Sequence, residues 1–188
     1  MQTQDLRGRI IGAAIDLEDK MDFLILNFLN PIVGQTAHQQ SVNKIIDKHF
    51  IQGKTFGSKI GLLKDFFKSE VFKEKYFITI DNFELFKIIS NTPGYTSYEK
   101  AIDHLLEKFR GVLEIRNTAA HGKLNYDIIK KSPDEIKEVL RDREFLNKGK
   151  LYTIDKSKEN QFYKDIDDLK RLVDHCSIVI MAAHLQLD

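Results

Sequence analysis

The sequence predicts an all-α fold, an up-down helical bundle that forms one domain over residues 1–188. Along most of the chain, apolar residues recur at steps of three and four, which is the spacing of one helix face. The apolar content of 42% is enough for one ordinary globular core. The chain shows no internal repeat, low-complexity tract or interdomain linker. A single helical domain is therefore the simplest interpretation.

Three helices are expected in the first part of the chain. The first runs along residues 10–28 and stops at Asn30-Pro31. A weaker pattern follows through Val42, Ile45, Ile46 and Phe50, with Gly53 as its end. A third helix over residues 56–67 places apolar residues at Phe56, Ile60, Leu63 and Phe67. Residues 81–90 are expected to form a short helix or a turn.

A fourth helix is the most clearly patterned element of the sequence. Thr96 and Glu99 have the spacing of a capping box, so the helix is expected to begin there. Gly122 is expected to end it as a left-handed terminator after His121. Between these points one face carries Ile102, Leu105, Phe109, Val112, Arg116 and Ala119.

The last part of the chain predicts a small insertion and a long closing helix. Residues 143–161 carry Lys148-Gly149 between two short mixed runs, which indicates a small hairpin or a loop. Residues 162–187 form the closing helix, and its second half is apolar nearly all round. That half is expected to be buried in the bundle or in a dimer contact. Cys176 lies there and is expected to be a packed apolar residue.

Charge and cysteine content exclude several classes of protein. Lys and Arg number 29 against 28 Asp and Glu, a net charge of +1, so any nucleic-acid contact must come from local placement of charge. One cysteine excludes an internal disulfide and suits a reducing cytosol. No run approaches the roughly 20 apolar residues of a membrane span, and residues 1–10 lack a signal-like apolar stretch. A cytoplasmic protein without a membrane segment is expected.

Arg116 stands where the apolar pattern calls for a leucine. At 100° per residue it lies within about 40° of Phe109 and Val112, on the side expected to face other helices. A buried unpaired cation is costly. Either an acidic residue of the first helix pairs with it, or its face opens into a polar groove or a subunit interface. The candidate acidic partners are Asp16, Glu18 and Asp22.

A polar stripe runs beside this apolar face, through Arg110, Glu114, Asn117 and His121. Arginine, an amide and an imidazole are groups that bind anions, and a phosphodiester presents the matching acceptors. The six histidines show no HExxH arrangement, so neither a metal nor a cofactor is expected. The stripe has a plainer explanation as well, in which Arg110 and Glu114 form a solvated pair and His121 only caps the helix.

The run Arg116-Asn117-Thr118-Ala119-Ala120-His121 resembles the R-N-x-x-x-H form of the motif of the HEPN superfamily. These are small helical-bundle domains of prokaryotic toxins, abortive-infection proteins and larger defence nucleases. The resemblance covers residues 98–122 and, more loosely, the first helix and residues 56–67. It implies a metal-independent endoribonuclease in which the ribose 2′-hydroxyl attacks the adjacent phosphate, in a composite site across a homodimer.

By position, the resemblance implies that Arg116 stabilises the phosphorane, His121 transfers protons and Asn117 orients one of them. Arg110 and Lys123 are the expected substrate-binding residues. One toxin branch of the superfamily has a Tyr two residues after the His, where this chain has Lys123. The sequence thus departs from that branch, and Lys123 is either a phosphate contact or a solvated loop residue.

Two classes of function follow from this resemblance. The first is a ribonuclease effector, a toxin or antiphage component, whose partners would be RNA and an antitoxin protein. The second is a HEPN-like bundle without catalysis, acting as a transcriptional regulator, an antitoxin or an assembly module.

Overall fold

The computed structural model describes residues 2–30, 36–74, 98–124, 132, 144–147 and 149–185. Its helices are α1 (Gln2–Leu29), α2 (Ala37–Ile46), the π-helix η1 (Asp47–Ile51), α3 (Phe56–Lys68), the short α4 (Glu70–Phe72), α6 (Tyr98–His121) and α8 (Lys156–Leu185). Its strands are β1 (Lys123–Leu124), β2 (Glu144–Asn147) and β3 (Lys150–Thr153). The predicted all-α bundle with a small insertion before the closing helix is confirmed.

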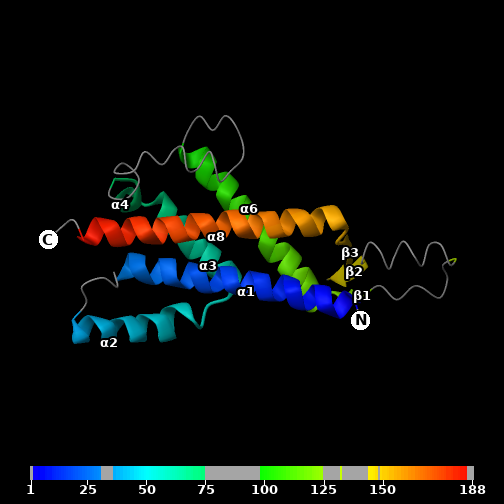
Figure 1. Cartoon of the computed structure of the whole chain (residues 1–188), viewed down its shortest axis with the longest axis horizontal. Helices are drawn as coiled ribbons and strands as arrows, with labels where there is room; N and C mark the ends of the chain where they lie inside the picture. The colour runs from blue at the N-terminus through cyan, green and yellow to red at the C-terminus, as the bar shows by residue number, and fades with distance from the viewer. Residues whose placement is uncertain are drawn as a thin grey trace.

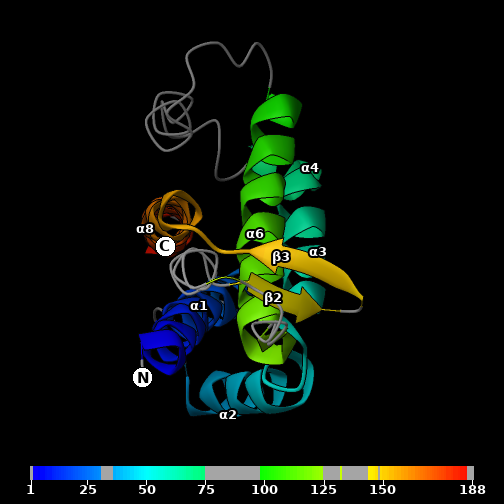
Figure 2. The same ribbon diagram turned by 90° about the vertical axis from the view of Figure 1, so that its right-hand side faces the viewer.

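The long helices form two layers, α1 with α8 and α3 with α6 (Figures 1 and 2). Ion pairs Asp16–Lys170 and Lys20–Asp174 join α1 to α8 at matching heights, so these two helices run parallel. Helix α3 runs antiparallel to α6, because the Tyr98 hydroxyl at the start of α6 donates to the Phe67 carbonyl near the end of α3 (2.6 Å). The small sheet lies at the end of the bundle where α6 stops and α8 begins (Figure 1).

The apolar faces that the sequence predicts for α1, α3 and α6 do form the core. On α1, Leu6, Ile10, Leu17 and Met21 are completely buried. The largest buried side chains of the same core include one aromatic ring from each of α3, α6 and α8, namely Phe67, Phe109 and Phe162. Cys176 is buried as expected, and burial raises the pKa of its thiol to about 12, so the thiol stays protonated and unreactive at neutral pH.

The second helix differs from its prediction in the face that it buries. Ile45 and Phe50 are 56% and 59% exposed, whereas Asn43 and Ile51 are buried. The π-helix η1 follows Ile46, and its wider turn changes the phase of Phe50 and Ile51 but not of Asn43 and Ile45, which precede it. The weak apolar pattern of residues 42–50 does not indicate a π-helix.

The closing helix α8 starts at Lys156, ahead of the predicted start at residue 162. Within its apolar second half, Val179 and Ile180 are buried, but Ile178 and Leu185 are 59% and 62% exposed. Only part of the apolar surface of this half is therefore buried within the chain. None of the described helices is both long enough and apolar enough to cross a bilayer.

The hairpin predicted around Lys148-Gly149 is confirmed as β2 and β3, which pair antiparallel. Gly149 has a φ of 76°, a left-handed conformation that favours glycine in the turn. The sequence did not predict β1, which pairs with β2 and completes a three-stranded sheet. The expected element at residues 81–90 and Thr96 of the capping box lie outside the described residues.

Candidate functional site

Three segments meet at the carboxyl end of α6, directly after the motif. The guanidinium of Arg7 on α1 donates to the carbonyl of Gly122, and it also lies 5.2 Å from the centre of the Phe145 ring. Phe145 on β2 is completely buried. A cation at this carbonyl end offsets the negative end of the helix dipole. Arg7 and Phe145 thus hold the end of α6, which carries His121, against the sheet.

The glycine directly after α6, Gly122, is required for a different reason from the one that the sequence suggests. The prediction of a left-handed terminator is wrong, because Gly149 alone among the described glycines has a positive φ. The Gly122 N–H donates to the Thr118 carbonyl (2.8 Å), which brings the Gly122 Cα close to that oxygen. A Cβ at this position would clash with the Thr118 oxygen and approach the Cβ of Phe145 to 3.0 Å. Glycine is required by space.

Gly122→Ala is therefore expected to lower the free energy of unfolding by about 1–3 kcal/mol, the usual cost of overpacking. The neighbours on both sides cannot retreat, since one is backbone and the other is a completely buried ring. Urea denaturation followed by circular dichroism would measure the change.

The matched control is Gly61→Ala on α3, where an added Cβ meets nothing within 4 Å. That substitution is expected to raise stability by roughly 0.5–1 kcal/mol through lower backbone entropy. Equal effects at the two positions would contradict a steric requirement at Gly122.

The polar stripe of α6 lines a groove of about 510 Å³. The opposite wall is made by the hairpin, through Asn147 at the end of β2 and Tyr152 on β3. His121 is exposed and Asn117 is half-buried, one turn apart on the same wall. Arg110 and Glu114 continue the wall along the helix. The groove thus combines an imidazole, two amides, a phenol and a guanidinium beside one carboxylate.

Arg116 lies outside this groove. His121 is five positions further along the helix, which corresponds to about 140° around it. Its side chain is half-buried, and its Nη1 donates to Oδ1 of Asn117 (3.0 Å). Asn117 therefore connects the arginine to the groove. Lys123 does not line the groove either, because it belongs to strand β1, where it pairs with Leu146 and is exposed.

Arg116 has no acidic partner among the described residues. The three carboxylates of the first helix proposed for it are engaged elsewhere: Glu18 and Asp22 pair with Lys59, and Asp16 pairs with Lys170. The alternative in which Arg116 forms a structural ion pair with one of these carboxylates is therefore wrong, because each carboxylate pairs with a lysine instead. The half-buried guanidinium keeps donors that Asn117 does not use.

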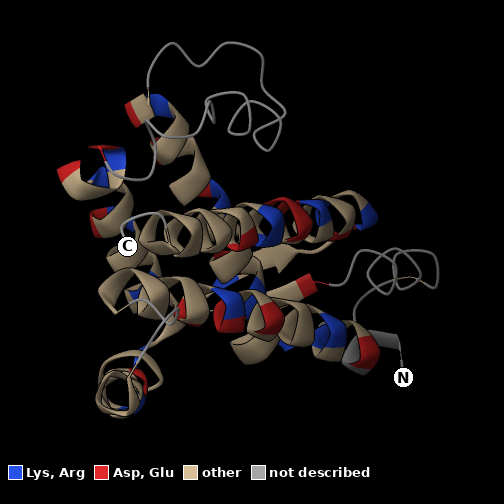
Figure 3. Cartoon of the chain, turned by 60° about the vertical axis from the view of Figure 1, so that its left-hand side comes forward, with Lys and Arg blue, Asp and Glu red and all other residues tan. Residues whose placement is uncertain are grey.

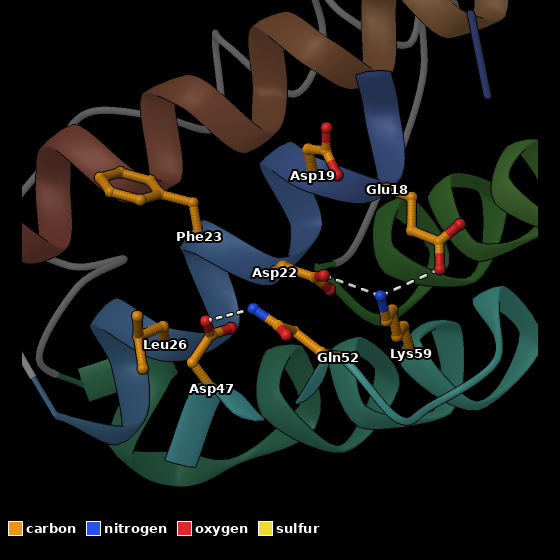
Figure 4. Close-up of a pocket in the computed structure, with 8 residues that line it drawn as sticks. All are labelled: Glu18, Asp19, Asp22, Phe23, Leu26, Asp47, Gln52 and Lys59. Atoms are coloured by element: carbon orange, nitrogen blue, oxygen red, sulfur yellow. Dashed lines mark hydrogen bonds and ion pairs between the residues drawn. The ribbon is translucent and has the colours of Figure 1, made fainter. Parts of the chain in front are cut away.

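A second cavity of about 480 Å³ lies between α1, η1 and α3 (Figure 4). The ammonium of Lys59 sits between the carboxylates of Glu18 and Asp22, at 2.9 and 2.7 Å. Burial acts to lower the pKa of Lys59, but hydrogen bonds to the two carboxylates outweigh it and leave this pKa raised. Burial also raises the pKa of Asp22. Lys59 therefore stays charged, and the cluster ties α3 to α1.

Three residues of the α6 region were not predicted as parts of the site, namely Arg7, Asn147 and Tyr152. Arg7 lies two residues from both Asp5 and Arg9 in a stretch with several polar residues, so it looks like a solvated helix residue. Asn147 and Tyr152 lie in a segment whose sequence indicates no more than a hairpin or loop. Only the pairing of β2 with β1, the strand that directly follows α6, brings the hairpin to the motif.

Cations and anions are interspersed over the face that Figure 3 shows, and the carboxyl half of α8 carries few charges there. This mixed pattern of the described residues agrees with the net charge of +1. A search of protein families, curated proteins and solved structures found no match to this chain.

Proposed function

We propose that this protein is a metal-independent endoribonuclease of the HEPN type, acting on RNA in the cytoplasm as a toxin or antiphage effector. The observation that carries the proposal is the groove at the end of α6, in which His121 and Asn117 of the motif face Asn147 and Tyr152. These groups suit a phosphodiester and its ribose better than an apolar ligand, since they offer hydrogen-bond donors and acceptors and one imidazole that can transfer a proton.

In the proposed reaction the ribose 2′-hydroxyl attacks the adjacent phosphorus and the 5′-oxygen of the next nucleotide leaves. His121 accepts the proton of the 2′-hydroxyl and returns a proton to the 5′-oxygen as that oxygen leaves, so no proton is gained or lost overall. A guanidinium stabilises the negative charge that grows on the phosphorane oxygens. The products are a 2′,3′-cyclic phosphate and a 5′-hydroxyl, so atoms and charge balance without a further reactant.

The position of Arg116 supports a site built from two copies of the chain. Within one chain Arg116 lies outside the groove that holds His121. A homodimer would let Arg116 of one copy reach the groove of the other, as the family resemblance implies. The exposed Ile178 and Leu185 of α8 are apolar surface that a second copy could cover.

One observation favours the alternative, a HEPN-like regulator, antitoxin or assembly module. It is the same separation of Arg116 from the groove, because a catalytic pair that never meets would leave only binding. Such a protein would bind RNA or a protein partner without cutting RNA.

Purified protein is expected to cut single-stranded or loop RNA in excess EDTA, because arginine, asparagine and histidine do the work without a divalent ion. Gel analysis should show fragments that end in a 2′,3′-cyclic phosphate or its 3′-phosphate hydrolysis product. The same RNA with 2′-O-methyl groups is the control and should remain whole, since it lacks the nucleophile. Loss of cleavage in EDTA, or cleavage of the methylated RNA, would contradict the assignment.

A further inference from the structure

A third cavity of about 340 Å³ adjoins the groove along α6. Its walls are mainly apolar and include Ile115 of α6 and Ile154, which follows β3. Tyr152, Thr118 and Glu114 line both spaces, so the two are continuous around the tyrosine ring. The volume lies within the range of roughly 300–1,000 Å³ for small-molecule sites. An apolar slot therefore opens directly beside the polar groove of the motif.

Tyr152 is held firmly at this junction. It pairs across the hairpin with Phe145, and Phe145 is completely buried beneath the end of α6. The ring is half-buried and packs against the core. Its hydroxyl forms no hydrogen bond with another residue of the described ranges. The aromatic ring thus lies at the junction of both spaces, with its polar atom available to a ligand.

The two spaces together match the chemistry of a nucleotide. A nucleobase has flat apolar faces and polar edges, and an unpaired base commonly stacks on an aromatic side chain while amides or carboxylates bind its edge. Here Tyr152 offers the ring, Ile115 and Ile154 offer apolar walls, and Asn147 and Glu114 offer groups for the edge. The polar groove with His121 then lies where the attached ribose and phosphate would follow.

We propose that the β2–β3 hairpin and α6 form a binding subsite for one unpaired nucleobase, with Tyr152 as its stacking residue. The subsite makes the hairpin the element that selects which phosphodiester enters the groove. This inference rests on the proposed ribonuclease function for its biological meaning, but the binding that it requires is independent of cleavage.

The test uses 2′-O-methyl RNA hexamers, which cannot be cleaved by 2′-hydroxyl attack, with and without one central abasic position. Fluorescence anisotropy would give the Kd of wild-type protein, Tyr152→Ala and Tyr152→Leu for each hexamer. Loss of base stacking is expected to raise the Kd for the complete hexamer about 5- to 150-fold. The Kd for the abasic hexamer should change little, because it has no base for the ring at that position.

The two variants and a neighbour separate stacking from folding. Tyr152→Leu keeps apolar packing in the sheet and removes the aromatic face together with the hydroxyl, so it should weaken binding while its melting profile stays that of wild type. The matched control is Leu151→Ala, at a 55% exposed neighbour that lines neither space and points to the other side of the strand. It should leave both Kd values unchanged.

A measurement on the wild-type protein removes any dependence on variants. A 2′-O-methyl hexamer with a central 2-aminopurine should lose fluorescence on binding, because stacking on Tyr152 quenches that base. The subsite would be refuted if the fluorescence of the bound 2-aminopurine were not quenched, or if the complete and abasic hexamers had equal Kd values. It would also be refuted if the protein bound peptides but none of these RNA hexamers. Base-dependent binding without cleavage of ordinary RNA would instead refute the ribonuclease and leave the subsite intact.

Discussion

His121→Ala is expected to slow RNA cleavage by about 10²- to 10⁴-fold, the usual contribution of a positioned proton-transfer group. His121 is the exposed imidazole of the groove, next to Asn117 and opposite the hairpin. Its removal should not disturb the fold, since the side chain lies on the surface at the end of α6. Single-turnover cleavage in EDTA would measure the effect. The matched control is His49→Ala, an exposed helix histidine on η1, which should cut RNA at the wild-type rate.

Arg116→Ala should cost a similar factor, because it removes the charge proposed to stabilise the phosphorane. The double variant should be little worse than the poorer single variant, since groups that act as a unit are not additive. Asn117→Ala should cost less, because the role proposed for this residue is only to orient the others. Each variant must keep the melting profile and the mass of the wild-type assembly.

Mixing the two single variants tests whether the site is shared. If Arg116 acts on the groove of the other copy, a mixed dimer of Arg116→Ala and His121→Ala contains one intact site and one doubly defective site. Random exchange of copies should then restore about a quarter of the wild-type activity. No recovery in a mixture shown to contain mixed dimers would exclude the composite site. Wild-type cleavage by a well-folded His121→Ala would refute the ribonuclease itself.

Lys59→Met is expected to lower the free energy of unfolding by about 3 kcal/mol, the lower end of the cost of breaking a buried ion pair. The Lys59 side chain is 4% exposed and holds Glu18 and Asp22, each 19% exposed (Figure 4). Methionine fills the same space, so the loss reports the two carboxylates left together without a cation. Their partial exposure to water keeps the cost from being larger. Urea denaturation at pH 7 would measure it.

Two further variants isolate the electrostatic cause. Lys20→Met removes a more exposed ion pair with Asp174 and should cost less than about 1 kcal/mol. Lys59→Met combined with Glu18→Gln and Asp22→Asn should recover most of the loss, because no uncompensated charge remains.

The deficit of Lys59→Met should also shrink as the pH falls toward 4. Burial already raises the pKa of Asp22, and the variant removes the cation that opposes this shift. A carboxyl with a raised pKa binds a proton more tightly in the folded state, so acid stabilises the variant relative to wild type. A deficit that does not depend on pH would point to packing as its cause.

The sequence by itself determined the helices whose buried face has a regular period. For α1, α3 and α6 the spacing of apolar residues fixes which side is buried, because 3.6 residues per turn leave one choice of face. It also identified the polar stripe of α6, since Asn117 and His121 are one turn apart within a single helix and need no tertiary contact to align. Local turn chemistry at Lys148-Gly149 indicated a hairpin or a loop, and the structure decided for the hairpin.

Only the tertiary structure decided what surrounds that stripe. Strand β1 is two residues long and has no sequence signature, yet its pairing with β2 brings Asn147 and Tyr152 opposite His121. The partners of Asp16, Glu18 and Asp22 likewise depended on which lysines α3 and α8 place beside α1, and both lysines lie far from these carboxylates in the chain. The steric need for glycine at position 122 could not be predicted from the sequence either, because Phe145, a residue of strand β2, occupies part of the space that a Cβ would need. Helical periodicity and turn chemistry depend on residues that are close in the sequence. The walls of a groove and the ion pairs between helices are made by residues that only tertiary packing brings together.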